Sequence, residues 1–460
     1  MRKPPTGEPC AGEPGAGLGL HARFGGRGGR EPFSTPIIWH LNPPWIPAFA
    51  GMTVGKVQLL GLSCCNNTKF PLARNRPGVY AALIAHGTEI DAKSVAAMTP
   101  GLDTHHVSAA MHALETPGRL RPANEQVVDF QMKHAIAELW GSGKTVSSDM
   151  VSLDASKHLW NVRIDPRRRT YAVGDYTHVL DQHGIIYDQP IVLNERQVGP
   201  AIEGVVRYND SAERVRLSLL AVDTHGYTNA GVAIAKLSGF DLCPHLRDLS
   251  ERRLVLPRSI DVPDELDPIV VRDVSLRAIR NGWDEVARCT ASVRSGRVSA
   301  NVLLQRLFGR AADGDPAHRA ADQLGRLLRT LFLCDYFSNP AFRREIHSIL
   351  NRGESVHRLQ RVIYSGKIPA ERGRRRDEMI AISGSHALLT NAVLAWNTHQ
   401  MQTTIDRWRR SNQTIEDAWI ACMGPAHFAH INFRGTFKFG VAKYAETLLG
   451  ETRSAARQTA

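Results

Sequence analysis

Three carboxylates in this chain stand where they could hold divalent cations. Asp223 follows Leu217–Val222, a nearly unbroken apolar run with the length and composition of a strand buried on both faces. A carboxylate at the carboxyl end of a central strand lies where α/β sheets place their ligands. An Asp here could equally cap the helix expected at 228–238, and this stretch alone does not separate the two roles. The catalytic role is favoured because the stretches around Asp149 and Glu354 supply two further carboxylates as its expected partners.

The elements expected to carry these two residues are a strand and a helix. Asp149 lies in a strand predicted over 145–153, and Glu354 in a helix predicted over about 340–364 that must pack against the sheet. The apolar stripe of that helix is formed by Ile346, Leu350, Gly353, Val356, Leu359 and Ile363. Its polar face carries His347, Asn351, Glu354, Arg358 and Arg361. A solvated face with an ordinary i, i+4 Glu–Arg pair is the alternative interpretation.

The chemistry of such a set is phosphoryl transfer. Mg²⁺ prefers oxygen ligands and few protein carboxylates. Two ions about 3.5–4 Å apart can activate an attacking hydroxyl and stabilise the leaving oxygen of a phosphodiester. Asp149, Asp223 and Glu354 are therefore predicted to share two Mg²⁺ ions, with Mn²⁺ as a substitute. Spacing alone only suggests this, because a chain of 460 residues offers many carboxylate triples.

The order of the other elements indicates an α/β plan with a mixed sheet. Before the first Asp we expect two short helices within 78–115 and a helix over 124–140. After it we expect a strand at 159–164 with Trp160, Val162 and Ile164 on one face, a hairpin of 170–180 with 185–193, and a helix over 195–208. Residues 270–338 look helical throughout, with a stripe of Leu324, Leu327, Leu328 and Leu331.

This pattern predicts a division of the chain into six parts. Residues 1–57 lack periodicity and resemble the translation of a dispersed intergenic repeat in an over-extended reading frame, which we favour over a disordered basic arm. The remaining parts are a helical lead-in (78–144), core strands and helices (145–269), a helical insertion (270–338), the Glu354 helix with a helical C-terminal region (339–450) and a polar tail (451–460).

Composition narrows the function classes. The net charge of +12 suggests a polyanionic partner, most simply nucleic acid, although basic charge alone is a weak signal. Seven scattered cysteines contain no Cys-x-x-Cys pair, which excludes a zinc ribbon and a thioredoxin-like site and indicates reduced cytosolic thiols. The sequence contains no run of 18 apolar residues, so no membrane-spanning helix is predicted.

The stretch Gly141-Ser-Gly-Lys-Thr145 invites a nucleotide-binding interpretation that we reject. In a P-loop the first glycine would stand at position 138, which is Glu138. A P-loop also follows a strand and opens a helix, whereas here a helix precedes and a strand is expected to follow.

Several short strings, in one order along 78–450, strongly resemble the catalytic region of Tn3-family transposases. They are Trp140-Gly, Ser147-Ser-Asp149, Asp175-Tyr-Thr-His-Val-Leu-Asp-Gln-His-Gly184, Val222-Asp-Thr-His-Gly-Tyr-Thr228, Leu242-Cys-Pro-His-Leu-Arg-Asp-Leu249, Leu350-Asn-Arg-Gly-Glu354, Trp396-Asn-Thr398 and His430-Ile-Asn432. Each is short, but so many in one order make a chance match very improbable.

This resemblance implies an α/β, ribonuclease-H-like mixed sheet with a helical insertion between the second and third acidic residues of an Asp149, Asp223, Glu354 triad. It also implies metal-dependent nicking at transposon ends and joining of the 3′-OH to target DNA. Arg247, Asp248, Asn351 and Arg352 match the motifs and would support the site. The residues expected to contact DNA are Arg247, Arg352, Arg358, Arg361, Arg374 and Arg375. The expected location is the bacterial cytoplasm, at the nucleoid and not at a membrane, and a homodimer is compatible with this function.

The chain departs from the family at three points. Met150 stands where the family usually has Gly, and His225 where it has Gly or Ala. Family members are far longer, and nothing in residues 1–77 replaces their N-terminal DNA-binding domains, so we expect a truncated transposase. A catalytically silent DNA-binding remnant is the alternative. A stand-alone ribonuclease-H-type nuclease lacks support, because it would not need the long helical insertion.

Overall fold

A computed structural model describes residues 76–211, 214–224, 226–308, 314–432 and 437. The predicted leader 1–57 and tail 451–460 therefore lie outside the described residues. The main sheet is formed by β1 (Thr145–Asp154), β2 (Arg163–Ile164), β3 (Tyr171–Leu180), β4 (Ile185–Ile191), β5 (Leu219–Val222) and β6 (Asp241–Pro244).

β1 is the central strand of this mixed sheet. It pairs antiparallel with β3 on one side and parallel with β5 on the other. β6 continues the sheet parallel to β5, while β4 and the short β2 pair antiparallel with β3. β7 (Leu254–Val255) and β8 (Val270–Val271) form a separate two-stranded ribbon.

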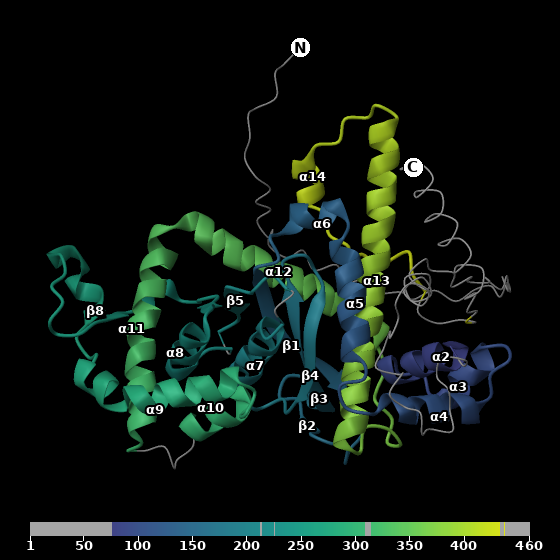
Figure 1. The fold of residues 1–460 in the computed structure, drawn as a ribbon, viewed down its shortest axis with the longest axis horizontal. Helices are drawn as coiled ribbons and strands as arrows, with labels where there is room; N and C mark the ends of the chain where they lie inside the picture. Colours follow the sequence, from purple (N-terminus) through teal and green to yellow (C-terminus); the bar gives the residue numbers. More distant parts are fainter. Residues whose placement is uncertain (1–75, 212–213, 225, 309–313, 433–436, 438–460) are drawn as a thin grey trace, which may run out of the picture.

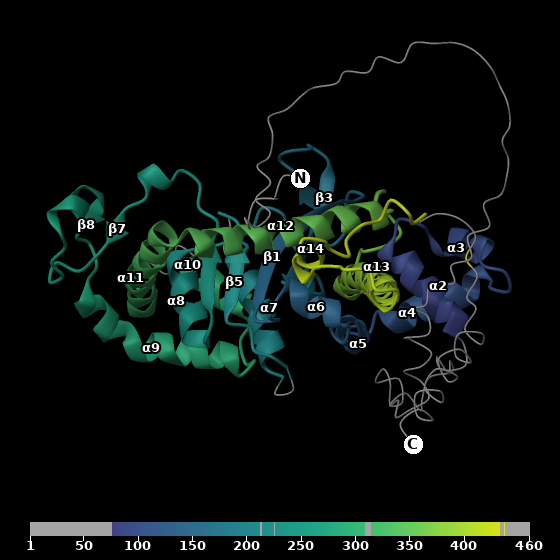
Figure 2. The same cartoon turned by 90° about the horizontal axis from the view of Figure 1, so that it is seen from above.

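Helices cover both faces of the sheet (Figures 1 and 2). The helices before β1 are α2 (Arg76–Gly87), α3 (Ala92–Met98), α4 (Thr104–Leu114), α5 (Arg121–Met132) and α6 (Ala135–Trp140). The later helices are α7 (Val198–Asn209), α8 (Asn229–Ser238), α9 (Leu276–Arg294), α10 (Ala300–Phe308), α11 (Pro316–Ser338), α12 (Pro340–Ile363), α13 (Arg376–Arg410) and α14 (Asp417–Ala421).

Side chains along each strand point alternately to the two faces of the sheet, so their contacts show which helices cover each face. Val146, Leu220 and Val222 belong to a core with α7 and α8, on which α9, α10 and α11 are layered. Val151 and Ala221 point to the other face, where they pack with α12, α13 and neighbouring segments. Both faces of the central strands are therefore buried, as their continuous apolar sequences indicate.

The long helix α13 joins the N-terminal helices to the sheet. Its Leu388 and Ala395 pack into the cluster formed by α2 to α5. By length and apolar composition it is the one helix among the described residues that could cross a membrane, but 78% of its most apolar window is buried inside the protein. That burial is typical of a core helix, in agreement with the absence of a predicted membrane span.

Most predicted elements are confirmed, including β1, the β3–β4 hairpin, α7, α8 and α12. The helix predicted over 124–140 is instead two helices, because the His134 side chain contacts the carbonyls of Phe130 and Gln131 at the end of α5. Residues 78–115 form three helices rather than two.

Two further predictions need correction. The strand predicted over 159–164 is a turn that leaves only the two residues of β2, since Asn161 has a φ of 62° and cannot continue a strand. Ile164 is 54% exposed, so it does not share a buried face with Trp160. The segment 270–338 is not helical throughout, because it begins with β8 and its first helix starts at Leu276.

A carboxylate network between the sheet and α13 predicts a pH dependence of stability. The Ser383 hydroxyl lies within hydrogen-bond distance of both Asp175 (2.6 Å) and Asp188 (2.8 Å), while His386 contacts Asp175 at 3.0 Å. Burial, followed by the nearby Asp175 charge, raises the pKa of Asp188 to about 6. The folded state thus binds a proton more tightly than the unfolded chain, so this group's contribution to stability is greatest below pH 4 and is lost as pH rises to 6.

Asp188→Asn is expected to remove that dependence. The free energy of unfolding of the variant should fall less steeply between pH 4 and 6, by roughly 1 kcal/mol per pH unit, because one titrating carboxyl is lost. Denaturant unfolding at several pH values measures this difference. Asp154→Asn, at a partly exposed carboxylate of the same sheet, serves as the control. Equal slopes for the unmodified chain and Asp188→Asn would contradict the prediction.

Candidate active site

Asp149 and Asp223 come from neighbouring parallel strands. Ser148 of β1 pairs with Val222 of β5, so the two acidic residues occupy the next position on each strand. Asp149 lies within β1, opposite Thr177 of β3, and Asp223 lies where β5 has ended. The Asp223 carboxylate accepts a hydrogen bond from the Gly226 amide at 3.0 Å, which fixes the turn after the strand.

Asp223 is not the cap of the helix that follows it. The N-cap of α8 is Thr228, whose hydroxyl accepts from the Gly231 amide at 3.1 Å. The capping role considered for Asp223 is therefore wrong, and its carboxylate lies at the carboxyl edge of the sheet. His225, in the same turn, lies outside the described residues.

Glu354 is carried over β1 by α12, which crosses the sheet as predicted (Figure 2). Gly353 makes this approach possible, because a Cβ at that position would lie 2.5 Å from the Ser147 hydroxyl. The predicted apolar stripe of α12 is buried, apart from the half-buried Leu350. The predicted polar face is exposed. Glu354 thus stands at the border between α12 and β1.

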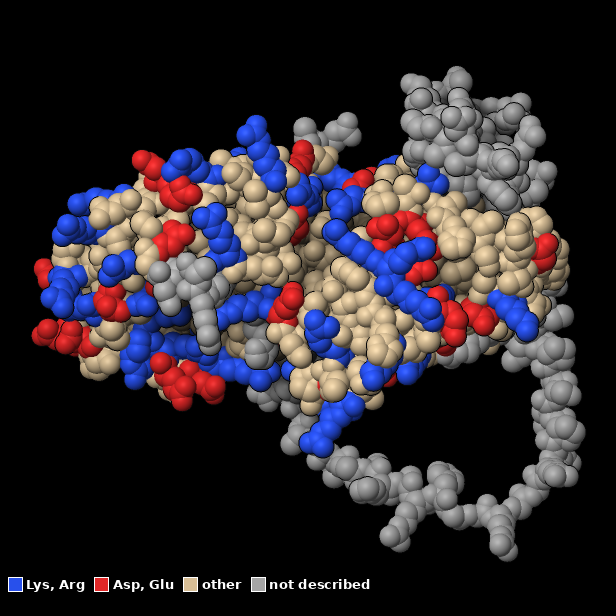
Figure 3. All heavy atoms as spheres, turned by 90° about the horizontal axis from the view of Figure 1, so that it is seen from below, with Lys and Arg blue, Asp and Glu red and all other residues tan. Residues whose placement is uncertain are grey.

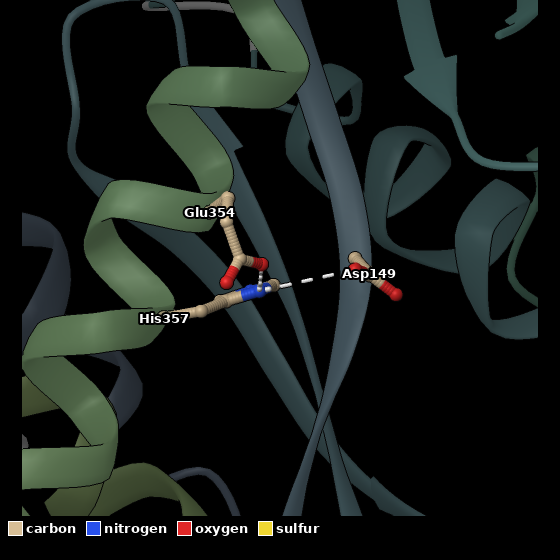
Figure 4. Close-up of side chains that lie close together, drawn as sticks. All are labelled: Asp149, Glu354 and His357. Carbon is tan, nitrogen blue, oxygen red and sulfur yellow. Dashed lines mark ion pairs between the residues drawn. The ribbon is translucent and has the colours of Figure 1, made fainter. Parts of the chain in front are cut away.

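A histidine missed in the sequence analysis lies between the two carboxylates. His357 Nδ1 lies 4.0 Å from Asp149 Oδ2 and 3.8 Å from Glu354 Oε2 (Figure 4). The three ligand atoms lie within 4.8 Å of one another, which makes this group a candidate cation site. The signal in the sequence was the i, i+3 spacing of His357 from Glu354, but His357 lies in neither the apolar stripe nor the polar face assigned to this helix.

Each carboxylate presents one oxygen to this group and engages the other elsewhere. Asp149 Oδ1 accepts from the Met150 amide at 2.7 Å. Glu354 Oε1 pairs with Arg361. The i, i+4 pair suggested as the alternative to chemistry would join Glu354 to Arg358, whereas the observed partner is Arg361, seven residues on. This pair uses only one of the two Glu354 oxygens.

The local electrostatics shift the pKa values of Asp149 and Glu354 in opposite directions. Burial raises the pKa of Asp149, with the charges of Asp223 and Glu354 adding to the effect against the opposing influence of His357. The pKa of Glu354 is lowered to about 2, first by its interaction with His357 and then by Arg361. Of these two residues, Asp149 is thus the one whose ionised form would be stabilised more by a neighbouring positive charge.

The arginines predicted to bind DNA lie in several separate places. Arg352 and Arg358 line a groove of about 950 Å³ beside Glu354, between α12 and residues 421–429, and Asn351 lines it too. Arg352 also donates to the Asp181 carbonyl at 2.8 Å, and burial lowers its pKa. Arg247 is exposed in the loop after β6, and Asp248 beside it has a left-handed backbone with a φ of 53°.

The predicted basic run at 367–376 is largely engaged within the protein. Arg375 pairs with Glu115 and Glu378, and Arg374 donates to the Ala370 carbonyl. Arg372 is buried against the backbone carbonyls of the α2–α3 turn. One face of the molecule shows Lys and Arg in bands interrupted by acidic clusters, not as a continuous basic surface (Figure 3).

The Gly141–Thr145 turn binds a carboxylate of the chain itself. The Ser142 and Gly143 amides donate to Asp181 at 3.0 and 3.1 Å, and the Thr145 hydroxyl donates to it at 2.9 Å. A helix precedes this turn and β1 follows it, as expected. The amides that a nucleotide phosphate would need are already occupied.

Comparison with known proteins agrees with this arrangement. The model of the Tn3 transposase DDE domain matches residues 66–437. The chain belongs to the Tn3 transposase DDE domain family. Within this family it is 46% identical over 371 residues to the transposase for insertion sequence element IS1071 in transposon Tn5271 from Comamonas testosteroni, an alignment covering 81% of this chain and 38% of that protein.

Less similar transposases match a similar share of the chain. The transposase for transposon Tn21 from Escherichia coli is 27% identical over 386 residues, covering 81% of this chain and 38% of the relative. The transposase for transposon gamma-delta from Escherichia coli strain K12 is 28% identical, covering 77% and 35%. The chain thus spans well under half the length of these relatives.

Proposed function

We propose that this chain provides the phosphoryl-transfer centre of a Tn3-type transposase, with Asp149, Asp223 and Glu354 as its catalytic and metal-binding residues. It would nick DNA at transposon ends and join the resulting 3′-OH to target DNA. The observation that carries this proposal is the approach of Asp149 and Glu354 across the β1–α12 contact, with Asp223 at the adjacent strand end. Membership of the DDE domain family supports it.

The proposed fold is ribonuclease-H-like. Three antiparallel strands (β4, β3 and β1) continue into two parallel ones (β5 and β6), and helices lie on both faces. The helices α9 to α11 stand between the second and third acidic residues, in agreement with the proposed insertion. The six-part division of the chain is retained as a proposal, with the insertion helices starting at Leu276.

The proposed cofactor is a pair of Mg²⁺ ions, with Mn²⁺ as a substitute. The donor set fits, because Asp149 and Glu354 each direct one oxygen toward His357 Nδ1, and no described residue forms a hydrogen bond with that buried nitrogen. When bound, such ions lower the pKa of the attacking hydroxyl and neutralise the leaving oxygen. The chain's own part is to hold these oxygens ionised and fixed, through the Met150 amide and Arg361.

DNA is the proposed partner, both as transposon end and as target. The groove along α12 carries Arg344, Arg352 and Arg358, which can contact DNA phosphates. Arg247, at the edge that also carries Asp223, can contact DNA from the other side. A homodimer would bring two ends together, and the bacterial nucleoid would be the place of action.

Strand transfer from a pre-cut end tests the proposal. A duplex with a recessed transposon 3′-OH and a supercoiled plasmid target are incubated with the chain and Mg²⁺ or Mn²⁺, and joined products are resolved on a gel. Metal-dependent joined or nicked products are expected. DNA binding without any metal-dependent chemistry would favour the silent remnant, which the family comparisons do not favour.

DNA affinity is expected to be largely independent of sequence and to fall steeply with salt, because phosphate contacts dominate it. Arg358→Ala should weaken binding of all duplexes equally and reduce the slope of log affinity against log salt by about 1. Fluorescence anisotropy at several salt concentrations measures this slope. Arg288→Ala, an exposed arginine on α9, should leave it unchanged. Strong preference for one inverted-repeat sequence would contradict the prediction.

A further inference from the structure

The buried imidazole of His357 makes a hydrogen-bond contact through only one of its two nitrogens within the described part of the chain. Its Nε2 lies 3.0 Å from the hydroxyl of Thr177, which is directly opposite Asp149 on β3. Its Nδ1 is buried and has no hydrogen-bond partner among the residues that the structure describes. The side chain is only 2% exposed, so water cannot readily satisfy this atom. An unpaired buried polar atom is costly and calls for a ligand.

The surroundings of Nδ1 indicate which ligand it would take. The two nearest charged atoms are the carboxylate oxygens Asp149 Oδ2 and Glu354 Oε2, and the other oxygen of each carboxylate is already engaged. Ligand atoms around one ion at about 2.1 Å lie roughly 3–4 Å from each other. The observed separations, all within 4.8 Å, would need only a small contraction around a cation.

We propose that His357 Nδ1 is a direct nitrogen ligand of the cation held between Asp149 and Glu354, so that Mn²⁺, the proposed substitute, binds at this one position more tightly than Mg²⁺. The inference deepens the proposed function, on which it rests, by assigning a nitrogen donor to one of its metal positions. Thr177 selects the tautomer: with Nε2–H donating to the threonine hydroxyl, Nδ1 keeps its lone pair. Imidazole nitrogen binds transition-metal ions better than it binds Mg²⁺, which favours oxygen.

The opposing interpretation is that His357 is a cation bridging two carboxylates. The two cases predict opposite effects of removing the imidazole. A ligand's removal weakens Mn²⁺ binding, whereas removal of a positive charge from between two carboxylates strengthens it.

Pulsed electron paramagnetic resonance of Mn²⁺ bound to the full chain tests the proposal. The unmodified chain should show ¹⁴N coupling from a directly bound imidazole, and growth with [¹⁵N]histidine should replace it with ¹⁵N coupling. His357→Gln should abolish the coupling and reduce Mn²⁺ affinity by roughly 10-fold or more, with a smaller change for Mg²⁺. Calorimetric titration with each ion gives the affinities.

His347→Gln is the matched control. His347 lies on the exposed face of the same helix, stacked on His245 at 5.4 Å, and its replacement should leave the ¹⁴N coupling intact. An unmodified chain that binds Mn²⁺ without nitrogen coupling, or a His357→Gln chain that binds Mn²⁺ more tightly, would overturn the inference while leaving carboxylate-based phosphoryl transfer untouched. Should His357→Gln not fold, the spectrum of the unmodified chain with labelled histidine still decides the question.

Discussion

Asp149→Asn, Asp223→Asn and Glu354→Gln are each expected to reduce metal-dependent strand transfer by roughly 10³-fold or more. Each change preserves side-chain volume and removes one ionised oxygen ligand, so the cation site loses affinity without loss of packing. Joined products from a pre-cut 3′-OH end, measured with Mg²⁺ and with Mn²⁺, report the effect. DNA binding should stay intact or become slightly tighter, because a negative charge facing phosphate is removed.

Glu371→Gln is the control for this set. Glu371 is an exposed carboxylate in the segment between α12 and α13, so its replacement removes the same charge elsewhere and should change little. Retention of strand transfer by Asp223→Asn in an active chain would refute the three-carboxylate mechanism. Loss of DNA binding together with activity would instead indicate that the variants are misfolded.

Gly325→Val is expected to destabilise the fold by about 3 kcal/mol, at the upper end for an overpacked core. A Cβ at Gly325 of α11 would lie 1.8 Å from the backbone carbonyl oxygen of Asn229, the first residue of α8. A backbone atom cannot rotate away, so the two helices must separate. Denaturant unfolding measures the change in free energy.

The same substitution should also reduce strand transfer, since the start of α8 closes the turn that follows Asp223. Leu331→Val provides the control on the same helix, because Leu331 is 57% exposed and its replacement should cost less than about 0.5 kcal/mol. A Gly325→Val chain as stable as the unmodified one would show that α11 is less closely packed against α8 than the structure indicates.

The strands and helix that carry the candidate site could be predicted because the spacing of their apolar residues indicates which faces are buried. The apolar run before Asp223 and the i, i+3, i+4 stripe around Gly353 each predict an element and the face it buries. Distances between those elements are not encoded in periodicity. The sequence therefore indicated which acidic residues lie at the sheet edge, but not that His357 lies between two of them.

In the helical insertion, the spacing of apolar residues does not predict which residue makes the closest contact between helices. The leucines of α11 predict the buried face, yet Leu331 is exposed and the closest contact is made through Gly325. A helix that approaches another backbone closely must present small residues, and these are invisible to a rule that counts large apolar side chains. The strand prediction for residues 159–164 was wrong for a similarly local reason, because Asn161 has a left-handed backbone conformation.

The position of α12 after the α9–α11 insertion has a consequence for the order in which the protein is synthesised. A nascent chain presents β1 and β5, with Asp149 and Asp223, while the helix that carries Glu354 is still inside the ribosome. Under the proposed function, such a chain holds two acids of the site and lacks the third. Incomplete translation products would therefore be unable to cut DNA, which protects the host genome from abortive synthesis.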